Sequence, residues 1–253
     1  MASIVDNPFF VLVVSFLGLL VAEKAGAAVR ARLRIIATGE QQDLNIVLTA
    51  TLTLLGLVIG FSFSMVVNRY DQRKNYEEGE ASSIGTEYTR ASLLPAADAA
   101  HIRETLLIYL DERVRFYEAR AARQLQQIAA STSRLQSELW SAVSAAGTKS
   151  PSAVIALAVS GMNDVLTSEG YAQAAWLNRL PLMAWGLMAV IALYSNFLFG
   201  LGSRHSRLLL FVVLPLAVSM SFFLIADIDS PRSGLIRVLP QNLLRLSESL
   251  RSQ

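Results

Sequence analysis

Four long stretches without a charged side chain constrain this chain more than any other feature of its sequence. No Asp, Glu, Lys or Arg occurs in residues 7–22, 44–68, 180–203 or 208–226. A helix rises about 1.5 Å per residue and the hydrocarbon layer of a bilayer is about 30 Å thick, so about 20 apolar residues cross it. A buried helix of a soluble domain normally keeps a polar stripe over such a length. We therefore predict an all-α integral membrane protein with four transmembrane helices.

The first of these stretches is the shortest and ends at Glu23-Lys24. Either the long side chains there extend along the helix to the lipid head groups, or neighbouring helices bury part of this helix. Ala25-Gly26-Ala27 has the small-residue spacing of a signal-peptide cleavage site, but no Lys or Arg precedes the apolar run. We therefore interpret residues 7–22 as a span. A basic connector then leads to the second span and carries Lys24, Arg30, Arg32 and Arg34.

The composition agrees with a membrane protein and removes several kinds of chemistry. Hydrophobic residues make up 53% and charged residues 17% of the 253 residues, and the mean hydropathy is +0.43. Without cysteine there is no disulfide, thiolate metal site or cysteine nucleophile. The two histidines, His101 and His205, have no second ligand nearby in sequence, and no catalytic or phosphate-binding motif occurs. We expect no enzymatic activity, metal or cofactor, and a net charge of +2 without a Lys/Arg block argues against a nucleic-acid partner.

The segment between the second and third spans is predicted to be helical and to lie outside the membrane. The helix of the second span meets no strong breaker before Pro95. Further on, apolar or small positions recur at spacings of three and four: Leu107, Leu110, Val114, Tyr117, Ala121, Leu125, Ile128, Thr132, Leu135 and Leu139. This spacing is typical of a coiled-coil-like seam. Ser150-Pro151 is suited to begin the helix that follows.

The predicted domains follow from these features. Residues 1–68 hold transmembrane helices 1 and 2 with the basic connector, and 69–179 form the extramembrane helical domain. Residues 180–228 form a hairpin of transmembrane helices 3 and 4, because the four-residue link at 204–207 favours antiparallel neighbours. Residues 229–253 are a polar C-terminal tail. Basic residues near the membrane edges are balanced between the two sides, so the positive-inside rule leaves the orientation undecided.

One face of the second span carries small and hydroxyl residues. Thr49, Thr53, Gly56, Gly60 and Ser64 recur at spacings of four, three, four and four, which places them on one helical stripe. Small residues let two helix backbones approach closely, and the pair Gly56 and Gly60 has the small-x-x-x-small spacing. Hydroxyl residues on such a stripe also line water-accessible ion paths. Span packing and pore lining both remain open from these residues.

Charged residues at two membrane boundaries are further candidates. The second span is followed by Arg69, Asp71 and Arg73, which in an oligomer would form a charged vestibule or else a salt-bridge network between helices. The fourth span ends at Asp227 and Asp229, with Arg232 close behind. Carboxylates at a membrane boundary are functional candidates, although Asp229-Ser230-Pro231 also suits a turn that ends the helix.

Several short motifs resemble a known family. They are Gly60-Phe61-Ser62-Phe63-Ser64, Arg69-Tyr70-Asp71-Gln72-Arg73, Glu80-Ala81, Ile84-Gly85-Thr86, Tyr88, Arg90-Ala91, Leu93-Leu94-Pro95, Asp227-Ile228-Asp229, Pro231-Arg232 and Gly234-Leu235-Ile236. Together they resemble the bestrophin-like family of bacterial four-span membrane proteins, which is remotely similar to bestrophin ion channels. The resemblance covers most of the chain.

The resemblance implies a homopentamer around a central axis, with ion conduction along a pore lined by the second span. It also implies that both termini and the helical domain of residues 69–179 lie in the cytoplasm, with the spans in the bacterial inner membrane. An apolar neck would fall at Ile59, Gly60, Phe63 and Val67. The contiguous neck pattern and acidic calcium clasp of true bestrophins are absent, so anion selectivity and calcium gating do not carry over.

Two hypotheses for function follow. The first is an oligomeric, bestrophin-like ion channel whose partners are the lipid bilayer, further copies of the chain and permeant inorganic ions. The alternative is a non-conducting membrane scaffold or sensor whose helical domain binds a partner. Neither the permeant ion nor the gating stimulus follows from the sequence.

Overall fold

The chain folds into two compact groups of helices. The computed structural model describes residues 7–33, 38–149, 151–203 and 208–252, and every regular element in these ranges is a helix. One group, the membrane unit, comprises Met1–Arg69 and Arg179–Arg237, and the other, the extramembrane unit, comprises Tyr70–Asn178 and Val238–Gln253. Four helical stretches are long and apolar enough to cross a membrane. The predicted all-α fold with four spans and an extramembrane segment between spans 2 and 3 is confirmed.

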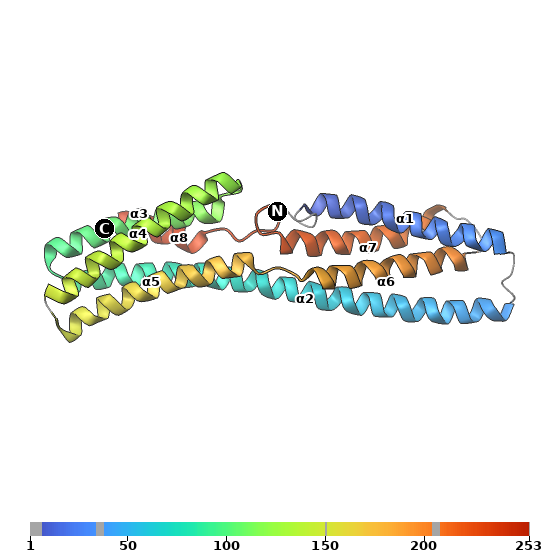
Figure 1. Cartoon of the computed structure of the whole chain (residues 1–253), viewed down its shortest axis with the longest axis horizontal. Helices are drawn as coiled ribbons and strands as arrows, with labels where there is room; N and C mark the ends of the chain where they lie inside the picture. Colours follow the sequence, from blue (N-terminus) through green and yellow to red (C-terminus); the bar gives the residue numbers. More distant parts are fainter. Residues whose placement is uncertain (1–6, 34–37, 150, 204–207, 253) are drawn as a thin grey trace. The chain divides into compact units, whose positions relative to one another are not determined.

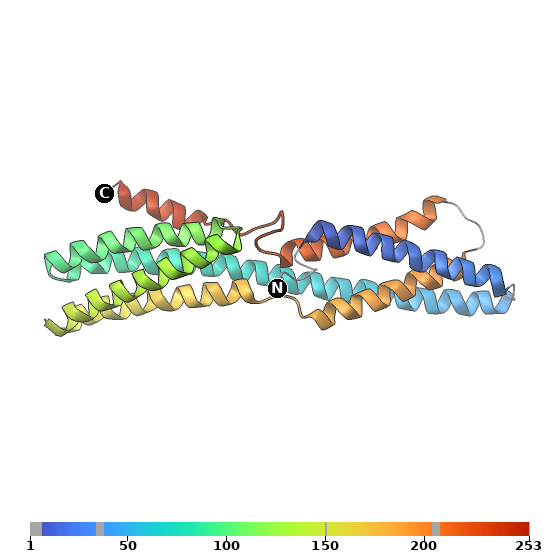
Figure 2. The same cartoon turned by 45° about the horizontal axis from the view of Figure 1, so that its top comes forward.

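The membrane unit contains α1 (Pro8–Leu33), the first part of α2 (Thr38–Arg90), α6 (Leu182–Gly202) and α7 (Leu208–Asp229). Figures 1 and 2 show that α1 and α6 run in the same direction, with α7 antiparallel to both. The α1 helix continues through Glu23 and Lys24 to Leu33, so the start of the predicted connector belongs to the first helix. Glu23 is buried whereas Lys24 is exposed, because only the former faces α6.

Two glycines set the contact between α1 and α6. A side chain at Gly26 would overlap the carbonyl oxygen of Phe197, and one at Gly200 would overlap the carbonyl oxygen of Glu23. The two backbones therefore approach as closely as small residues allow, which is the usual basis of helix packing in lipid. Arg30 closes the end of this contact by donating to the Leu201 carbonyl at 2.8 Å.

The extramembrane unit contains the rest of α2, the 3₁₀ turn η2 (Ala91–Leu93), α3 (Ala96–Glu118), α4 (Ala122–Lys149), α5 (Ala153–Leu177) and α8 (Gln241–Arg251). As predicted, α2 runs on from the span without a break until the turn before Pro95. Over 53 residues it is about 80 Å long, far more than a bilayer requires. Its second half therefore belongs to the water-facing part of the protein.

The predicted coiled-coil-like seam is divided between two helices. The chain turns at 119–121, where Ala119 adopts an extended conformation with φ −63° and ψ 135°, so α3 and α4 pack together as a hairpin. Leu110 and Val114 on α3 and Ile128 and Leu135 on α4 are buried in a common core. The periodicity thus identified the buried faces, but a turn without Gly or Pro gave no signal of the break.

The helix boundaries near the ends of the unit also differ from expectation. The N-cap of α5 is Ser152, whose hydroxyl accepts from the Ile155 amide at 3.1 Å, two residues after the predicted Ser150, which lies outside the described residues. The C-terminal tail forms α8, whose first amides donate to a carboxylate of α2. Glu77 Oε1 accepts from the Asn242 and Leu243 amides at 2.8 and 3.0 Å, which satisfies the open N-terminus of α8.

A buried ionic network joins the four long helices of this unit. Arg113 on α3 donates through Nε to Glu80 of α2 at 2.7 Å and through Nη1 to Glu169 of α5 at 3.3 Å. Tyr117 donates to the second oxygen of Glu80 at 2.6 Å, and Gln136 of α4 donates to Glu169 at 3.3 Å. Burial raises the pKa of Tyr117 above its ordinary range, and the nearby Glu80 carboxylate raises it further, so its hydroxyl remains a donor.

Removal of the central cation should destabilise the extramembrane unit. Arg113→Ala leaves two carboxylates in a low-dielectric interior without their cation, and we expect a loss of about 3–5 kcal/mol in the free energy of unfolding. Arg115→Ala is the control, because Arg115 is exposed and its ion pair with Glu112 is worth about 1 kcal/mol or less. Denaturant unfolding in detergent, followed by circular dichroism, measures both. Equal losses for the two variants would contradict the role of the network.

Candidate functional site

The second helix packs on the rest of the membrane unit through one narrow face. Leu55, Ser62 and Val66 are the buried residues of its apolar part, and Arg69 continues this face at the helix's exit from the span. With about 100° between successive residues, these positions lie on one side of the helix. The remainder of the apolar part is half-buried or exposed in the single chain.

The stripe of small and hydroxyl residues lies on the opposite side of α2. Thr49, Thr53, Gly56, Gly60 and Ser64 are all exposed. At Gly56 and Gly60, a Cβ would have no atom of the described residues within 4 Å apart from those of its chain neighbours and the nearby backbone of its own helix. These glycines therefore do not bring α2 close to another span of the same chain. Lining a path and meeting another copy of the chain are the uses that remain.

The outward face of α2 combines hydroxyl groups, which can accept hydrogen bonds, with neighbouring apolar side chains. The Thr49 and Thr53 hydroxyls donate to the Asn45 and Thr49 carbonyls at 2.8 Å, so their oxygen lone pairs remain available outward. Of the residues assigned to an apolar neck, Phe63 is exposed and Ile59 and Val67 are half-buried. Phe61 has 66% of its surface exposed beside the stripe.

The three charged residues after the span have different surroundings. Arg69 lies 3.8 Å from Asp229, and Arg73 is buried and donates to the Ala175 and Asn178 carbonyls at 3.1 and 3.0 Å. Only Asp71 is exposed, in line with Gly60 and Ser64. Arg69 thus has an ionic partner and Arg73 has backbone partners within the chain. The vestibule and salt-bridge roles of Arg69, Asp71 and Arg73 both stay predictions.

Glu78 is a second acidic residue on this line that sequence reasoning missed. It lies two helical turns beyond Asp71 and is exposed. The seven-residue spacing from Asp71 is the signal that could have found it. The outward face of α2 therefore continues beyond the stripe as a polar face with two carboxylates.

The carboxylates at the end of the fourth span bind backbone amides. Asp227 accepts from the Leu235 and Ile236 amides at 2.6 and 2.9 Å, and Asp229 accepts from the Leu180 amide at 2.9 and 3.1 Å. A side chain at Gly234 would overlap the Asp227 carbonyl oxygen, so the turn requires glycine. This geometry supports the turn interpretation of the two aspartates. Arg232 is half-buried in the same turn.

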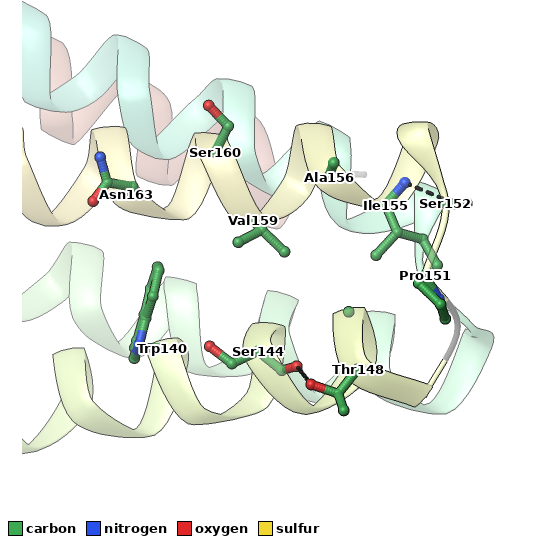
Figure 3. Close-up of a pocket in the computed structure, with 11 residues that line it drawn as sticks. Trp140, Ser144, Thr148, Pro151, Ser152, Ile155, Ala156, Val159, Ser160 and Asn163 are labelled. Carbon is green, nitrogen blue, oxygen red and sulfur yellow. Dashed lines mark hydrogen bonds between the residues drawn. The ribbon is translucent and has the colours of Figure 1, made fainter.

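A separate groove with a volume of about 640 Å³ lies between α4 and α5. Figure 3 shows the residues that line it. Trp140, Ser144 and Thr148 line it from α4, and Ser160 and Asn163 line it from α5. It holds hydroxyl and amide groups but no charged side chain.

The described residues contain no group of His, Asp or Glu side chains arranged to hold a metal ion. His101 is exposed on α3 and lies 3.6 Å from Glu138. His205 lies outside the described residues. Two features are carried forward from the described residues, namely the outward face of α2 and the groove of Figure 3.

Comparisons with known proteins identify the family. Three structures of a bacterial bestrophin homologue from Klebsiella pneumoniae, each of a single-residue variant, share the fold of this chain. The first two have TM-scores of 0.65 at 14% identity, covering 100% and 99% of this chain and 97% and 100% of theirs. The third has a TM-score of 0.61 at 15% identity, covering 95% and 98%. Among curated proteins, none matches this chain. The model of the bestrophin-like domain matches residues 9–243, and the chain therefore belongs to the bestrophin-like family of membrane proteins.

Proposed function

We propose that this chain is a subunit of an ion channel of the bestrophin type, in which the outward face of α2 lines the ion path. The observation that carries the proposal is the position of the stripe. Its five residues are exposed and lie opposite the buried face of α2, and a side chain at Gly56 or Gly60 would meet no other span among the described residues. The Thr49 and Thr53 hydroxyls already donate to carbonyls of their own helix, and a water-filled axis would in addition hydrate their outward lone pairs.

A single outward-facing helix cannot enclose a path, so the proposal requires several copies around one axis. A closed ring with cyclic symmetry places the same face of each α2 toward the centre. Five copies is the number that the family resemblance implies. We also propose that the extramembrane unit faces the cytoplasm and that the spans lie in a bacterial inner membrane.

The proposed path has an apolar constriction within a polar stripe. Ile59, Phe63 and Val67 lie along one edge of the stripe, close to Gly60. Rings of apolar side chains gate channels by excluding water when the path narrows. The absent side chain of Gly60 keeps the path open at this level, because a bulky residue in every copy would fill the axis.

Cations are the proposed permeant ions. Asp71 and Glu78 continue the line of the stripe beyond the span, and both are exposed. In a symmetric oligomer each would form an acidic ring, which concentrates cations at the entrance and repels anions. The hydroxyl oxygens of Thr49 and Thr53 present acceptors to the same kind of ion. Lys74 lies nearby on the helix and reduces the negative charge without cancelling it.

The alternative function is a non-conducting scaffold or sensor. The groove of Figure 3 favours it, because exposed Trp140 beside hydroxyl groups resembles the aromatic anchors of protein interfaces. Such a protein would show no flux, and substitution of Gly60 would have no functional effect.

Blocking the stripe should stop ion flux while the oligomer persists. In liposomes with paired cation and anion gradients, we expect wild-type flux and a decrease of at least about tenfold for Gly60→Leu. The control is Gly186→Leu on α6, where the added side chain also meets open space but lies off the stripe. Size-exclusion chromatography checks the assembly of each variant. Absence of wild-type flux, or equal flux in the two variants, contradicts the channel proposal.

Neutralising the two acidic residues should weaken the preference for cations. The double variant Asp71→Asn with Glu78→Gln removes the negative rings, so the reversal potential under a salt gradient should shift toward zero, most clearly at low ionic strength. The double variant Glu104→Gln with Glu118→Gln removes two exposed acids of α3 and is the matched control. An unchanged reversal potential in the first variant would show that selectivity arises elsewhere.

A further inference from the structure

Glu87 is a buried acidic residue that the proposed ion path does not use. The second charge-free stretch ends at Asn68. Glu87 lies on α2, 19 residues or about 28 Å further along the helix. Its side chain is fully buried, and neither carboxylate oxygen has a hydrogen-bond partner among the described residues. Every other buried carboxylate of the described extramembrane unit, such as Glu77 and Glu80, accepts hydrogen bonds.

The carboxyl group of Glu87 is pressed against the backbone of α5. A side chain at Gly161 would overlap Glu87 Oε2 and would lie 2.6 Å from Arg90 Nη1. Glycine at this position therefore makes room for the carboxyl group within the contact of α2 and α5. Neighbours of Gly161 on α5, including Ala158, Met162 and Val165, are buried in the hydrophobic core. The carboxyl group thus lies in a closely packed contact and has no solvent-exposed surface.

Two charged groups act on Glu87. Arg90 follows it on the same helix, and Asp164 lies on α5, 3.9 Å from Arg90. Because Arg90 is shared with Asp164 and partly exposed, it does not provide Glu87 with a hydrogen bond. Burial raises the pKa of Glu87 to about 8, Arg90 opposes this effect, and Asp164 adds to it.

We infer that Glu87 is a proton-binding site that couples the packing of α2 against α5 to pH. With its proton, the neutral carboxyl fits beside Gly161 at the smaller cost of a buried polar group. When the proton passes to solvent, an anion without donors remains in the contact, and water must enter or the helices must separate near Gly161. Loss of the proton therefore loosens the contact of α2 with α5.

The direction of the pH effect follows from proton binding. The unfolded chain holds this proton only below its ordinary pKa of 4.5, whereas the folded chain holds it up to about pH 8. Between these values the folded chain carries the extra proton, so the contribution of Glu87 to the free energy of unfolding decreases as pH rises. Glu87→Gln replaces the acid with a neutral group of the same shape and should remove this decrease.

The test compares thermal unfolding of the full chain in detergent between about pH 5 and pH 9. We expect Glu87→Gln to match the wild-type Tm at the acid end and to exceed it by about 4 °C or more at the alkaline end. Glu104→Gln, an exposed acid on α3, should follow the wild-type profile throughout. A Tm difference between wild type and Glu87→Gln that does not vary with pH overturns the inference.

Two further measurements locate the effect. Hydrogen exchange of α5 amides around Gly161, corrected for the intrinsic rate, should lose protection at alkaline pH in the wild type and keep it in Glu87→Gln. Gly161→Ala should lower the Tm at every pH, because the added methyl group takes the space of the carboxyl group. An unchanged Tm in Gly161→Ala, or equal exchange in wild type and Glu87→Gln, counts against the site.

A functional readout rests on the proposed function. If the outward face of α2 lines an ion path, liposome flux should depend on pH in the wild type and lose this dependence in Glu87→Gln. A protein without flux at any pH would end the channel proposal and leave the unfolding and exchange results to decide the proton site by themselves.

Discussion

The guanidinium of Arg113, held between Glu80 and Glu169, is the interaction on which the extramembrane unit depends. One cation contacts carboxylates from two helices while belonging to a third, so α2, α3 and α5 must adopt one relative register. A hydrophobic core fills space but tolerates sliding, whereas a buried charge with fixed donors specifies one arrangement. The helix α2, whose Glu80 belongs to this network, is the same unbroken helix that contains the second span.

Glycine has two opposite uses in the membrane unit. Gly26 and Gly200 allow the backbones of α1 and α6 to touch, and a methyl group at either position would overlap a carbonyl oxygen. Gly56 and Gly60 are surrounded by open space instead. The same residue type thus stabilises an intrachain contact in one place and leaves an outward helix face without a side chain in another. Only the second use is relevant to the proposed ion path.

Much of the fold could be predicted from the sequence, because lipid imposes a strong and local requirement on composition. The four charge-free stretches became four apolar helices, and α2 continued to the turn before Pro95. The break between α3 and α4 was missed because Ala119-Arg120-Ala121 has no residue that favours a turn. The contact of Gly26 with Phe197 was also missed, since it joins residues far apart in the chain.

The stripe of small and hydroxyl residues on α2 was predictable from the sequence, but the side of the membrane unit toward which it points was not. Spacing places Thr49, Gly56 and Gly60 on one face, and only the positions of Leu55 and Val66 against the other helices show that this face points outward. The partners of Arg69 and Arg73 lie more than 100 residues away, beyond any local pattern. The spacing from Asp71 could have indicated Glu78, whereas Glu87 follows no motif and its burial becomes visible only in the folded chain.

The link between Glu77 and α8 has a consequence for biosynthesis. Glu77 is synthesised before the Asn242 and Leu243 amides that it accepts from, which follow it by 165 and 166 residues. Until residues 242 and 243 have been synthesised, this carboxylate has neither of these donors, so its contact with α8 forms only after α6 and α7 have been made.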